Sequence, residues 1–227
     1  MSLNYYIMDT EVTGLSVDVH EINQISVQRV SDAKQYSAQI KVKKPHVYNY
    51  KALEVQGIHP SQLKVGIPVE QAVQEIDEFL SEDEKTKAHR CIVAHNAPFD
   101  RKFIHRAWDV VKKEFLADLW ICTQSLAHRY VKKHGKTKIA QTQKNAGVDL
   151  KVDKKGMLKP KFGLTNFMLG VGLTPKLGSH QAHVDVQNTL ELFNWFLNSS
   201  RTEYLSLIER IPHKKEPPID YLDIEDC

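Results

Sequence analysis

The spacing of apolar residues in the first half of the chain predicts β-strands. Residues 5–8 form a short apolar run, which is typical of a buried strand. Residues 22–30, "INQISVQRV", alternate apolar and polar side chains as a half-buried strand does, and residues 36–42 are expected to pair with them as a hairpin. Residues 91–94 follow a charged loop and predict a central strand.

Helical spacing appears in the segments between and after these strands. Residues 69–80 carry apolar side chains three and four positions apart, and residues 121–131 and 182–197 are likewise predicted to be helices. In "HNAPFDRKFIHRAWDVV", Asn96 is suited to cap a helix whose first turn contains Pro98. Strands followed by alternating strands and helices predict an α/β fold with a mixed sheet.

Composition and charge narrow the class of protein. The 227 residues, 41% of them hydrophobic, suffice for one substantial core, and no apolar run approaches the roughly 18–20 residues that span a bilayer. We expect no secretory leader and no membrane partner. Three scattered cysteines without a CxxC pair favour a reducing, cytoplasmic location over a disulfide framework or a structural zinc site. The net charge of +3 permits a nucleic-acid partner.

Two segments differ from this average. Residues 132–161 contain ten lysines and only two acids, Asp149 and Asp153. This lysine-rich connection is either a solvated loop or a flap that contacts the phosphates of a nucleic-acid strand. We expect one domain over residues 1–198. Residues 199–227 are expected to form a C-terminal helix or a partly mobile tail, whose acidic end is either a docking peptide or disordered.

Acidic residues stand at the ends of three predicted elements. Asp9 and Glu11 in "IMDTEVTGL" lie two positions apart, so on a strand they share one face and repel each other unless a cation or a proton intervenes. A solvated turn is the alternative interpretation. Asp100 lies near the first turn of its helix, where the helix dipole alone would stabilise an acid.

Asp185 is the third position, and it begins an inward-facing helical row with Thr189, Leu192 and Phe196. A buried carboxylate needs a partner, which is either a basic side chain or a metal ion. His180 lies five residues earlier, so it can share a site with Asp185 only from a loop before the helix. His183 falls within the helix and is read as a surface or supporting residue.

Four carboxylates and one loop histidine suggest a particular chemistry. Hard oxygen ligands without a cysteine cluster favour Mg²⁺ or Mn²⁺ over zinc. Paired hard cations can activate water and stabilise the charge that develops during phosphodiester cleavage. A neutral histidine at the rim of such a site is suited to act as general base.

Three stretches together resemble the DEDDh 3′→5′ exonucleases, a superfamily that includes the epsilon-type proofreading subunit of bacterial DNA polymerase III. The resemblance covers about residues 4–197. The stretches are "IMDTEVTGL", "IVAHNAPFDRKFI" and "HQAHVD", and their order and spacing agree with the family. The matching positions are Asp9, Glu11, Thr13, Gly14 and Leu15, then His95, Asn96, Ala97, Phe99 and Asp100, and finally His180, Ala182 and Asp185.

The resemblance implies a ribonuclease H-like fold, with a mixed five-stranded sheet flanked by helices. It implies that two divalent cations, Mg²⁺ or Mn²⁺, are held by the four acids and that His180 is the general base. Residues implied to bind the 3′-terminal nucleotide or to lie near it are Thr10, Val12, Thr13, Gly14, Leu15, Gln56, Asn96 and Phe99. Two positions depart from the family's pattern: Gln56 replaces a histidine near the substrate, and Gln24 replaces an acid in a structural contact.

The activity implied by the resemblance is metal-dependent 3′→5′ exonuclease action on single-stranded or frayed DNA, releasing nucleoside 5′-monophosphates. The partners would be nucleic-acid 3′ ends, with single-stranded DNA favoured over RNA, and a DNA polymerase is a candidate partner. Two alternatives remain open. One is an exoribonuclease of the same superfamily, because no reader of the 2′-hydroxyl is evident. The other is a module that binds nucleic acid without cleaving it.

Overall fold

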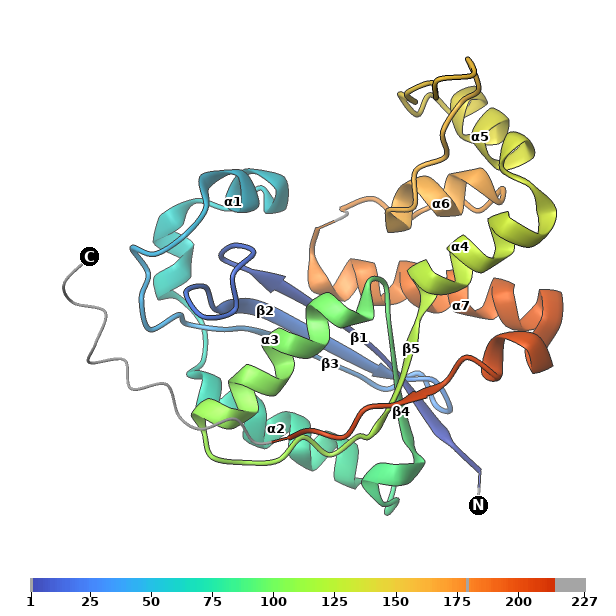
Figure 1. Ribbon diagram of the computed structural model, residues 1–227. Helices are drawn as coiled ribbons and strands as arrows, with labels where there is room; N and C mark the ends of the chain where they lie inside the picture. Colours follow the sequence, from blue (N-terminus) through green and yellow to red (C-terminus); the bar gives the residue numbers. More distant parts are fainter. Residues whose placement is uncertain (1, 179, 215–227) are drawn as a thin grey trace.

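The strands form one mixed sheet in the computed structural model, which describes residues 2–178 and 180–214. Within these residues the order of the six strands is β3-β2-β1-β4-β5-β6 (Figure 1). Strands β1, β4 and β5 are parallel, while β2 and β3 at one edge and β6 at the other run antiparallel to their neighbours. The bounds are Asn4–Val12 for β1, Ile22–Arg29 for β2, Gln35–Gln39 for β3, Arg90–Ala94 for β4, Leu119–Cys122 for β5 and Glu209–Arg210 for β6.

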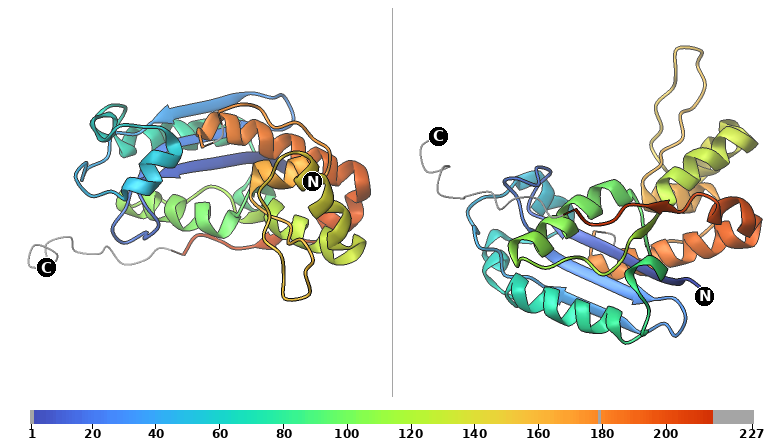
Figure 2. Two further views of the ribbon diagram at one scale, coloured as in Figure 1. Left: turned by 90° about the horizontal axis from the view of Figure 1, so that it is seen from above. Right: turned by 60° about the horizontal axis from the view of Figure 1, so that its bottom comes forward.

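Helices cover both faces of this sheet (Figure 2). Helices α2 and α3 pack on one face with apolar residues of β1, β4 and β5, and helices α4, α6 and α7 pack on the other. Helix α1 stands beyond one end of the sheet (Figure 1). The helices are Tyr50–Gln56 (α1), Val69–Ser81 (α2), Ala97–Val110 (α3), Thr123–His134 (α4), Lys136–Asn145 (α5), Leu164–Gly170 (α6) and Ala182–Leu205 (α7), with short 3₁₀ turns at Pro60–Lys64 and Lys87–His89.

Alternation along β1 determines which residues face which layer. Tyr6 and Met8 lie in the core beneath α2 and α3, whereas Ile7 lies in the core beneath α7. Asp9 and Glu11 continue the Ile7 side of the strand and therefore point toward α7. The strand thus carries its two acids out of the core, at its carboxyl end, toward the layer that contains Asp185.

The structure confirms the α/β architecture and most of the predicted elements, and it corrects two points. The sheet has six strands rather than five, because the two-residue strand β6 pairs with β5. Residues 121–131 are not one helix: β5 ends at Cys122 and α4 begins at Thr123. The apolar run 119–122 passes directly into a helix without a turn residue, so apolar spacing alone did not separate the strand from the helix.

The chain remains part of the fold beyond the predicted boundary at residue 198. Helix α7 continues to Leu205, with a kink at Ser200, and β6 follows. His213 is buried, and its Nδ1 accepts a hydrogen bond of 2.9 Å from the backbone N–H of Phe115. The acidic end of the predicted tail, residues 215–227, lies outside the described residues. No helix in the described part of the chain is long and apolar enough to cross a membrane.

Candidate active site

The carboxyl end of β1 presents the first two acids of the site. Asp9 and Glu11 are both half-buried, and in the sheet they lie opposite Ser26 and Gln24 of β2. The register shifts between Glu11 and Val12, so regular pairing is interrupted immediately after the second acid. Both carboxylates therefore lie at the end of β1 on the face covered by α7.

Helix α3 brings the third acid against the same strand. Asp100, only 3% exposed, accepts hydrogen bonds at Oδ1 from the Thr10 backbone N–H (3.1 Å) and the Thr10 hydroxyl (2.8 Å). Asn96 occupies the predicted N-cap position of the helix with a left-handed φ of 66°, but its side chain makes no capping hydrogen bond. The turn at Asn96 nevertheless leads directly from β4 into α3 and sets Asp100 in the first helical turn.

The fourth acid and the histidine come from the start of α7. Asp185 is 8% exposed, and its Oδ2 accepts a hydrogen bond of 2.8 Å from the backbone N–H of His180. His180 is exposed on the loop before α7, with a left-handed φ of 67°. Ligand atoms of Glu11, His180 and Asp185 all lie within 4.8 Å of one another. His183, in contrast, is exposed on α7.

The electrostatics show that the four acids share one environment. Burial, together with the negative charges of Asp100, Glu11 and Asp185, raises the pKa of Asp9 well above its usual range. Burial followed by the charges of Asp185 and Asp100 raises the pKa of Glu11 to about 8. Burial also raises the pKa of Asp100 to about 7, against the opposing effect of its Thr10 hydrogen bonds. Without a cation, this cluster therefore holds protons that isolated carboxylates would lose.

Asp185 also has a raised pKa, and its surroundings indicate whether a cation would fit in the site. Burial raises its pKa, although the His180 backbone N–H opposes this effect. Its Oδ1 is buried without a well-oriented hydrogen-bond partner among the described residues. An orphaned carboxylate oxygen beside three further acids and no cysteine matches the ligand preference of a hard divalent cation. The donor set therefore fits Mg²⁺ or Mn²⁺.

The loop that follows β1 is held by its own hydrogen bonds. The Thr13 hydroxyl accepts a bond of 3.1 Å from the Glu21 N–H, and the Thr13 N–H donates to the Glu21 carbonyl at 2.9 Å. A Cβ placed on Gly14 would lie 2.4 Å from the His20 ring, so a larger residue here would force that ring to move. Leu15 follows with 70% of its surface exposed. The loop is thus closed by hydrogen bonds at its base, and it exposes an apolar side chain at Leu15.

The other predicted substrate residues differ in how they are placed. Val12 is buried. Gln56 is also buried: its Nε2 donates to the Val12 carbonyl and its Oε1 accepts from Asn23 Nδ2, both at 2.8 Å. The Gln56 amide therefore anchors α1 to the end of β1. Phe99 is half-buried, with its ring 5.2 Å from that of Phe103, and Asn96 is exposed.

Further contacts at this edge involve Asn49, Tyr50 and Lys102, which the sequence did not single out, and Gln24, which it did. The Asn49 backbone N–H donates to the Thr13 carbonyl at 2.7 Å, which places the neighbouring Tyr50, 76% exposed, beside the loop after β1. Lys102 Nζ donates to the Leu15 carbonyl at 3.2 Å and so ties α3 to the loop tip. Gln24, expected to alter a structural contact, accepts from the Ala182 N–H at 3.4 Å. These contacts join distant parts of the chain, and no local pattern signals them.

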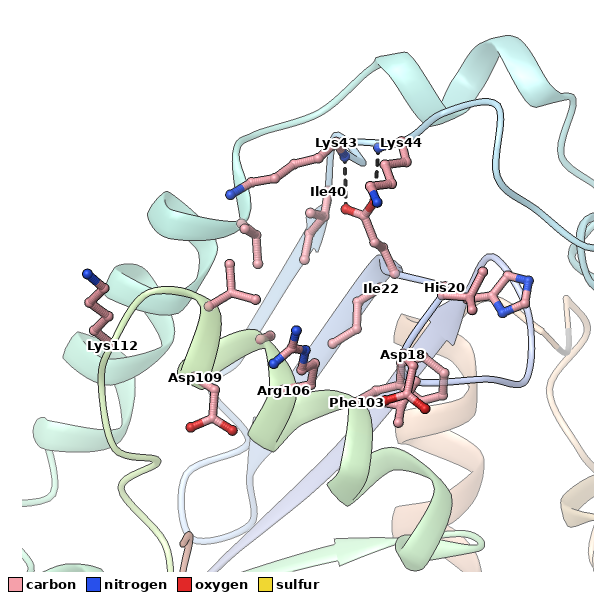
Figure 3. Close-up of a pocket in the computed structure, with 16 residues that line it drawn as sticks. Asp18, His20, Ile22, Ile40, Lys43, Lys44, Phe103, Arg106, Asp109 and Lys112 are labelled. Carbon is pink, nitrogen blue, oxygen red and sulfur yellow. Dashed lines mark hydrogen bonds between the residues drawn. The ribbon is translucent and has the colours of Figure 1, made fainter. Parts of the chain in front are cut away.

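A separate pocket of about 450 Å³ lies between α3 and the segment that leads into β2 (Figure 3). Its lining contains none of the four acids, and includes Ile22, Ile40 and Phe103. Its wall residue Glu21 accepts hydrogen bonds from the backbone N–H groups of the neighbouring lysines 43 and 44. The pocket is therefore distinct from the acidic centre at the end of β1.

Comparisons with known proteins agree with this combination of fold and acidic centre. Residues 6–193 match the family model described as exonuclease (RNase_T). The chain therefore belongs to the RNase_T exonuclease family. No curated protein sequence matches it significantly. The match supports a nuclease, and an exonuclease domain of this kind also suggests dependence on divalent metal ions.

Solved structures show the same fold at low sequence identity. E. coli exonuclease I bound to a dT13 oligonucleotide has a TM-score of 0.64 at 14% identity, covering 90% of this chain and 43% of its own. Another exonuclease I structure has a TM-score of 0.67 at 13% identity, with coverage of 90% and 43%. Cell-death related nuclease 4 (CRN-4) has a TM-score of 0.66 at 10% identity, with coverage of 88% and 65%. The chain thus spans less than two thirds of each of these proteins.

Proposed function

We propose that the protein is a metal-dependent 3′→5′ exonuclease that releases nucleoside 5′-monophosphates from single-stranded or frayed DNA. The observation that carries this proposal is the convergence of Asp9, Glu11, Asp100 and Asp185 from β1, α3 and α7, with one buried oxygen of Asp185 that lacks a well-oriented hydrogen bond. Burying several carboxylates together without a compensating positive charge is costly in free energy, so the cluster is best explained as a cation site.

The four carboxylates would hold two divalent cations, Mg²⁺ or Mn²⁺. When bound, such ions lower the pKa of water and stabilise negative charge on a phosphoryl group. The chain itself contributes orientation: the two Thr10 hydrogen bonds fix the Asp100 carboxylate, and the His180 N–H fixes one oxygen of Asp185. These contacts keep the ligands in place before a substrate arrives, which reduces the reorganisation needed for catalysis.

His180 is proposed as the general base. Its exposure on a loop at the rim leaves the imidazole accessible to water, and its ring lies close to Glu11 and Asp185. A neutral imidazole nitrogen would accept the proton of the attacking water, and the adjacent carboxylates would stabilise the imidazolium that forms. The proton would then leave to solvent from this open position.

DNA is favoured over RNA as substrate because the fold is shared with exonuclease I, one of whose structures contains a dT13 oligonucleotide. The exposed tip at Leu15 and the exposed ring of Tyr50 offer apolar surface to unstacked bases. Matched DNA and RNA oligonucleotides of one sequence would separate the two substrates. Faster loss of the RNA would favour the exoribonuclease alternative.

The direct test uses an oligonucleotide labelled at its 5′ end, incubated with Mg²⁺ or Mn²⁺. A ladder that shortens stepwise, together with release of nucleoside 5′-monophosphates, would establish the polarity and the bond that is cleaved. Asp9→Ala and Asp185→Ala should abolish this activity while the circular dichroism spectrum is retained, and His180→Ala should slow it by about 10²-fold or more. Asp18→Ala, a change at an exposed acid outside the cluster, is the matched control. Full activity in either cluster variant would reject the proposal.

Two wider elements of the proposal concern the setting of the reaction. A role in proofreading, as in the epsilon-type subunit, requires that the protein bind a DNA polymerase, which co-elution of the two proteins would test. A cytoplasmic location is proposed from the cysteine pattern. Cys91 and Cys122 are both free thiols, and imaging of the tagged full chain would test the location.

A further inference from the structure

The positive charge of the protein is concentrated in residues 132–161, here called the lysine arm. Its ten lysines and two aspartates give it a formal charge of +8. The whole chain carries +3, so the remaining residues carry −5. Residues 215–227 account for −4 of this charge, so the rest of the chain is nearly neutral and the arm is its concentrated basic element, which favours a polyanionic partner for the arm.

The lysine arm is a structured projection rather than a plain loop. It includes the end of α4, the whole of α5 and a returning segment, and it extends away from the sheet beyond α6 (Figures 1 and 2). Residues Val152 and Leu158 form an antiparallel bridge, and Lys136 forms an ion pair of 2.7 Å with Asp153. Gln143 fastens the return, because its Nε2 donates to the carbonyls of Lys161 (2.7 Å) and Asn166 (2.8 Å).

Most of the arm's lysines are exposed and free to meet a ligand. Lys136 pairs with Asp153, and Lys133 pairs with Glu203 of α7. Among the residues that the structure describes, the other lysines of the arm form no ion pair. These are Lys132, Lys138, Lys144, Lys151, Lys154, Lys155, Lys159 and Lys161, and all of them are exposed.

The base of the arm is attached to the edge of the acidic centre. The carbonyl of Phe162, the residue after the arm, accepts a hydrogen bond of 2.8 Å from His95 Nε2, and the Phe162 ring stacks on His128 at 3.7 Å. His95 follows β4 directly and stands two residues before α3, the helix that carries Asp100. The arm therefore rises from the point where β4 ends beside the site.

We propose that the lysine arm binds the phosphate backbone of the substrate upstream of the nucleotides held in the acidic centre. This inference rests on the proposed function. The ten residues of α5 alone extend about 15 Å at 1.5 Å per residue, and the arm projects away from the sheet (Figure 1). Lysines are point charges without base specificity, so the contact is sequence-independent. It weakens as the salt concentration rises, because the release of counterions from the strand is then less favourable.

The test compares two variants with the same change in charge. Lys151→Gln/Lys154→Gln/Lys155→Gln removes three charges from the arm, and Lys41→Gln/Lys112→Gln/Lys214→Gln removes three from exposed lysines of the body. Lys136 is left unchanged because it pairs with Asp153. Thermal unfolding of both variants checks that the fold is retained.

Binding is measured separately from cleavage, by fluorescence anisotropy of a labelled 20-nucleotide strand in EDTA between 50 and 200 mM salt. If all three lysines contact phosphates, the arm variant should lower the slope of log Kd against log salt by about 2, since each contact with a single strand contributes about 0.7. Its affinity at 0.1 M salt should fall about ten- to a hundredfold. The body variant should retain the slope of the wild type.

Cleavage of a trinucleotide in Mg²⁺ completes the design, because it is too short to reach the arm. The arm variant should cleave it at the wild-type rate while its kcat/KM for the 20-nucleotide strand falls. Equal slopes for the two variants would overturn the inference, as would an equal loss of activity on both substrates. Binding of the arm to anionic lipid vesicles, without a change in the DNA slope, would also overturn it. Failure of the wild type to cleave either substrate would contradict the proposed function instead, since DNA binding in EDTA is measured independently.

Discussion

Replacing Asp100 by asparagine should stabilise the metal-free protein at alkaline pH, although it should abolish activity. Asp100 is buried among other carboxylates, and its pKa rises from the usual 3.8 to about 7. The amide oxygen of asparagine can still accept both Thr10 hydrogen bonds, so the substitution removes the charge and retains the contacts. The experiment therefore measures how much the charge on Asp100 lowers the stability of the metal-free protein.

The magnitude follows from linkage. The folded state keeps the Asp100 proton to a higher pH than the unfolded state, so the stability of the metal-free protein falls as the pH rises from about 4 to about 7. Because each tenfold change in proton affinity corresponds to about 1.4 kcal/mol, the full effect above pH 7 approaches about 4 kcal/mol. The neighbouring acids share this cost, so we expect a gain of about 2–4 kcal/mol, or roughly 4–16 °C in Tm for a domain of this size.

The assay is thermal unfolding in EDTA at pH 4.5, 6 and 8, with the Asp18→Asn variant as a control for a change at an exposed acid. The gain of Asp100→Asn should be small at pH 4.5 and largest at pH 8, and the control should show none. Addition of Mn²⁺ should raise the Tm of the wild type by ligand linkage and that of the variant much less. A gain that is the same at all three pH values, or no gain at pH 8, would refute the reasoning.

Three further substitutions test how the site is supported. Gly14→Ala should lower nuclease activity because its Cβ collides with the His20 ring, and adding His20→Ala should restore activity; no rescue by the second change would contradict the steric argument. Gln56→Ala should cost about 1–3 kcal/mol in urea unfolding, because it leaves two buried partners unsatisfied, and a loss below measurement error would count against that anchor. Asp83→Ala should cost about 3–5 kcal/mol in the same assay, because Arg90 would be left buried without its carboxylate; a neutral result would show that water reaches the guanidinium.

Apolar spacing predicted the elements whose faces bury many side chains. Strands β1, β2 and β4 and helices α2 and α7 were found because each packs an unbroken or regularly spaced apolar row into the core. Strand β5 was missed because its four residues lead directly into α4. Strand β6 has only two residues, Glu209 and Arg210, and both are exposed. The residues after it also contact the sheet edge, since the Ile211 N–H donates a hydrogen bond of 2.7 Å to the Asp118 carbonyl. Tertiary contacts of this kind leave no periodic pattern.

The acids of the site could be predicted because charge at the end of an apolar segment is costly and therefore conspicuous. The structure brings Asp9, Glu11, Asp100 and Asp185 together and places His180 on the loop that the spacing required. The supporting contacts could not be predicted. Gln56 and Val12 lie 44 positions apart, and Lys102 and Leu15 lie 87 apart, so neither pair is visible in a local pattern.

Charge explains why the acidic centre and the lysine arm belong together in the proposed reaction. A nucleic-acid strand is a polyanion, and the clustered carboxylates of the acidic centre oppose its approach. Cations held by the four carboxylates would remove this repulsion only at the end of the strand. The arm, attached through Phe162 to the residue that follows β4, supplies attraction farther along the strand. Lysines placed among the carboxylates would instead pair with them and compete with the cations. The acidic centre and the lysine arm can therefore both act on the same strand because the fold keeps them apart.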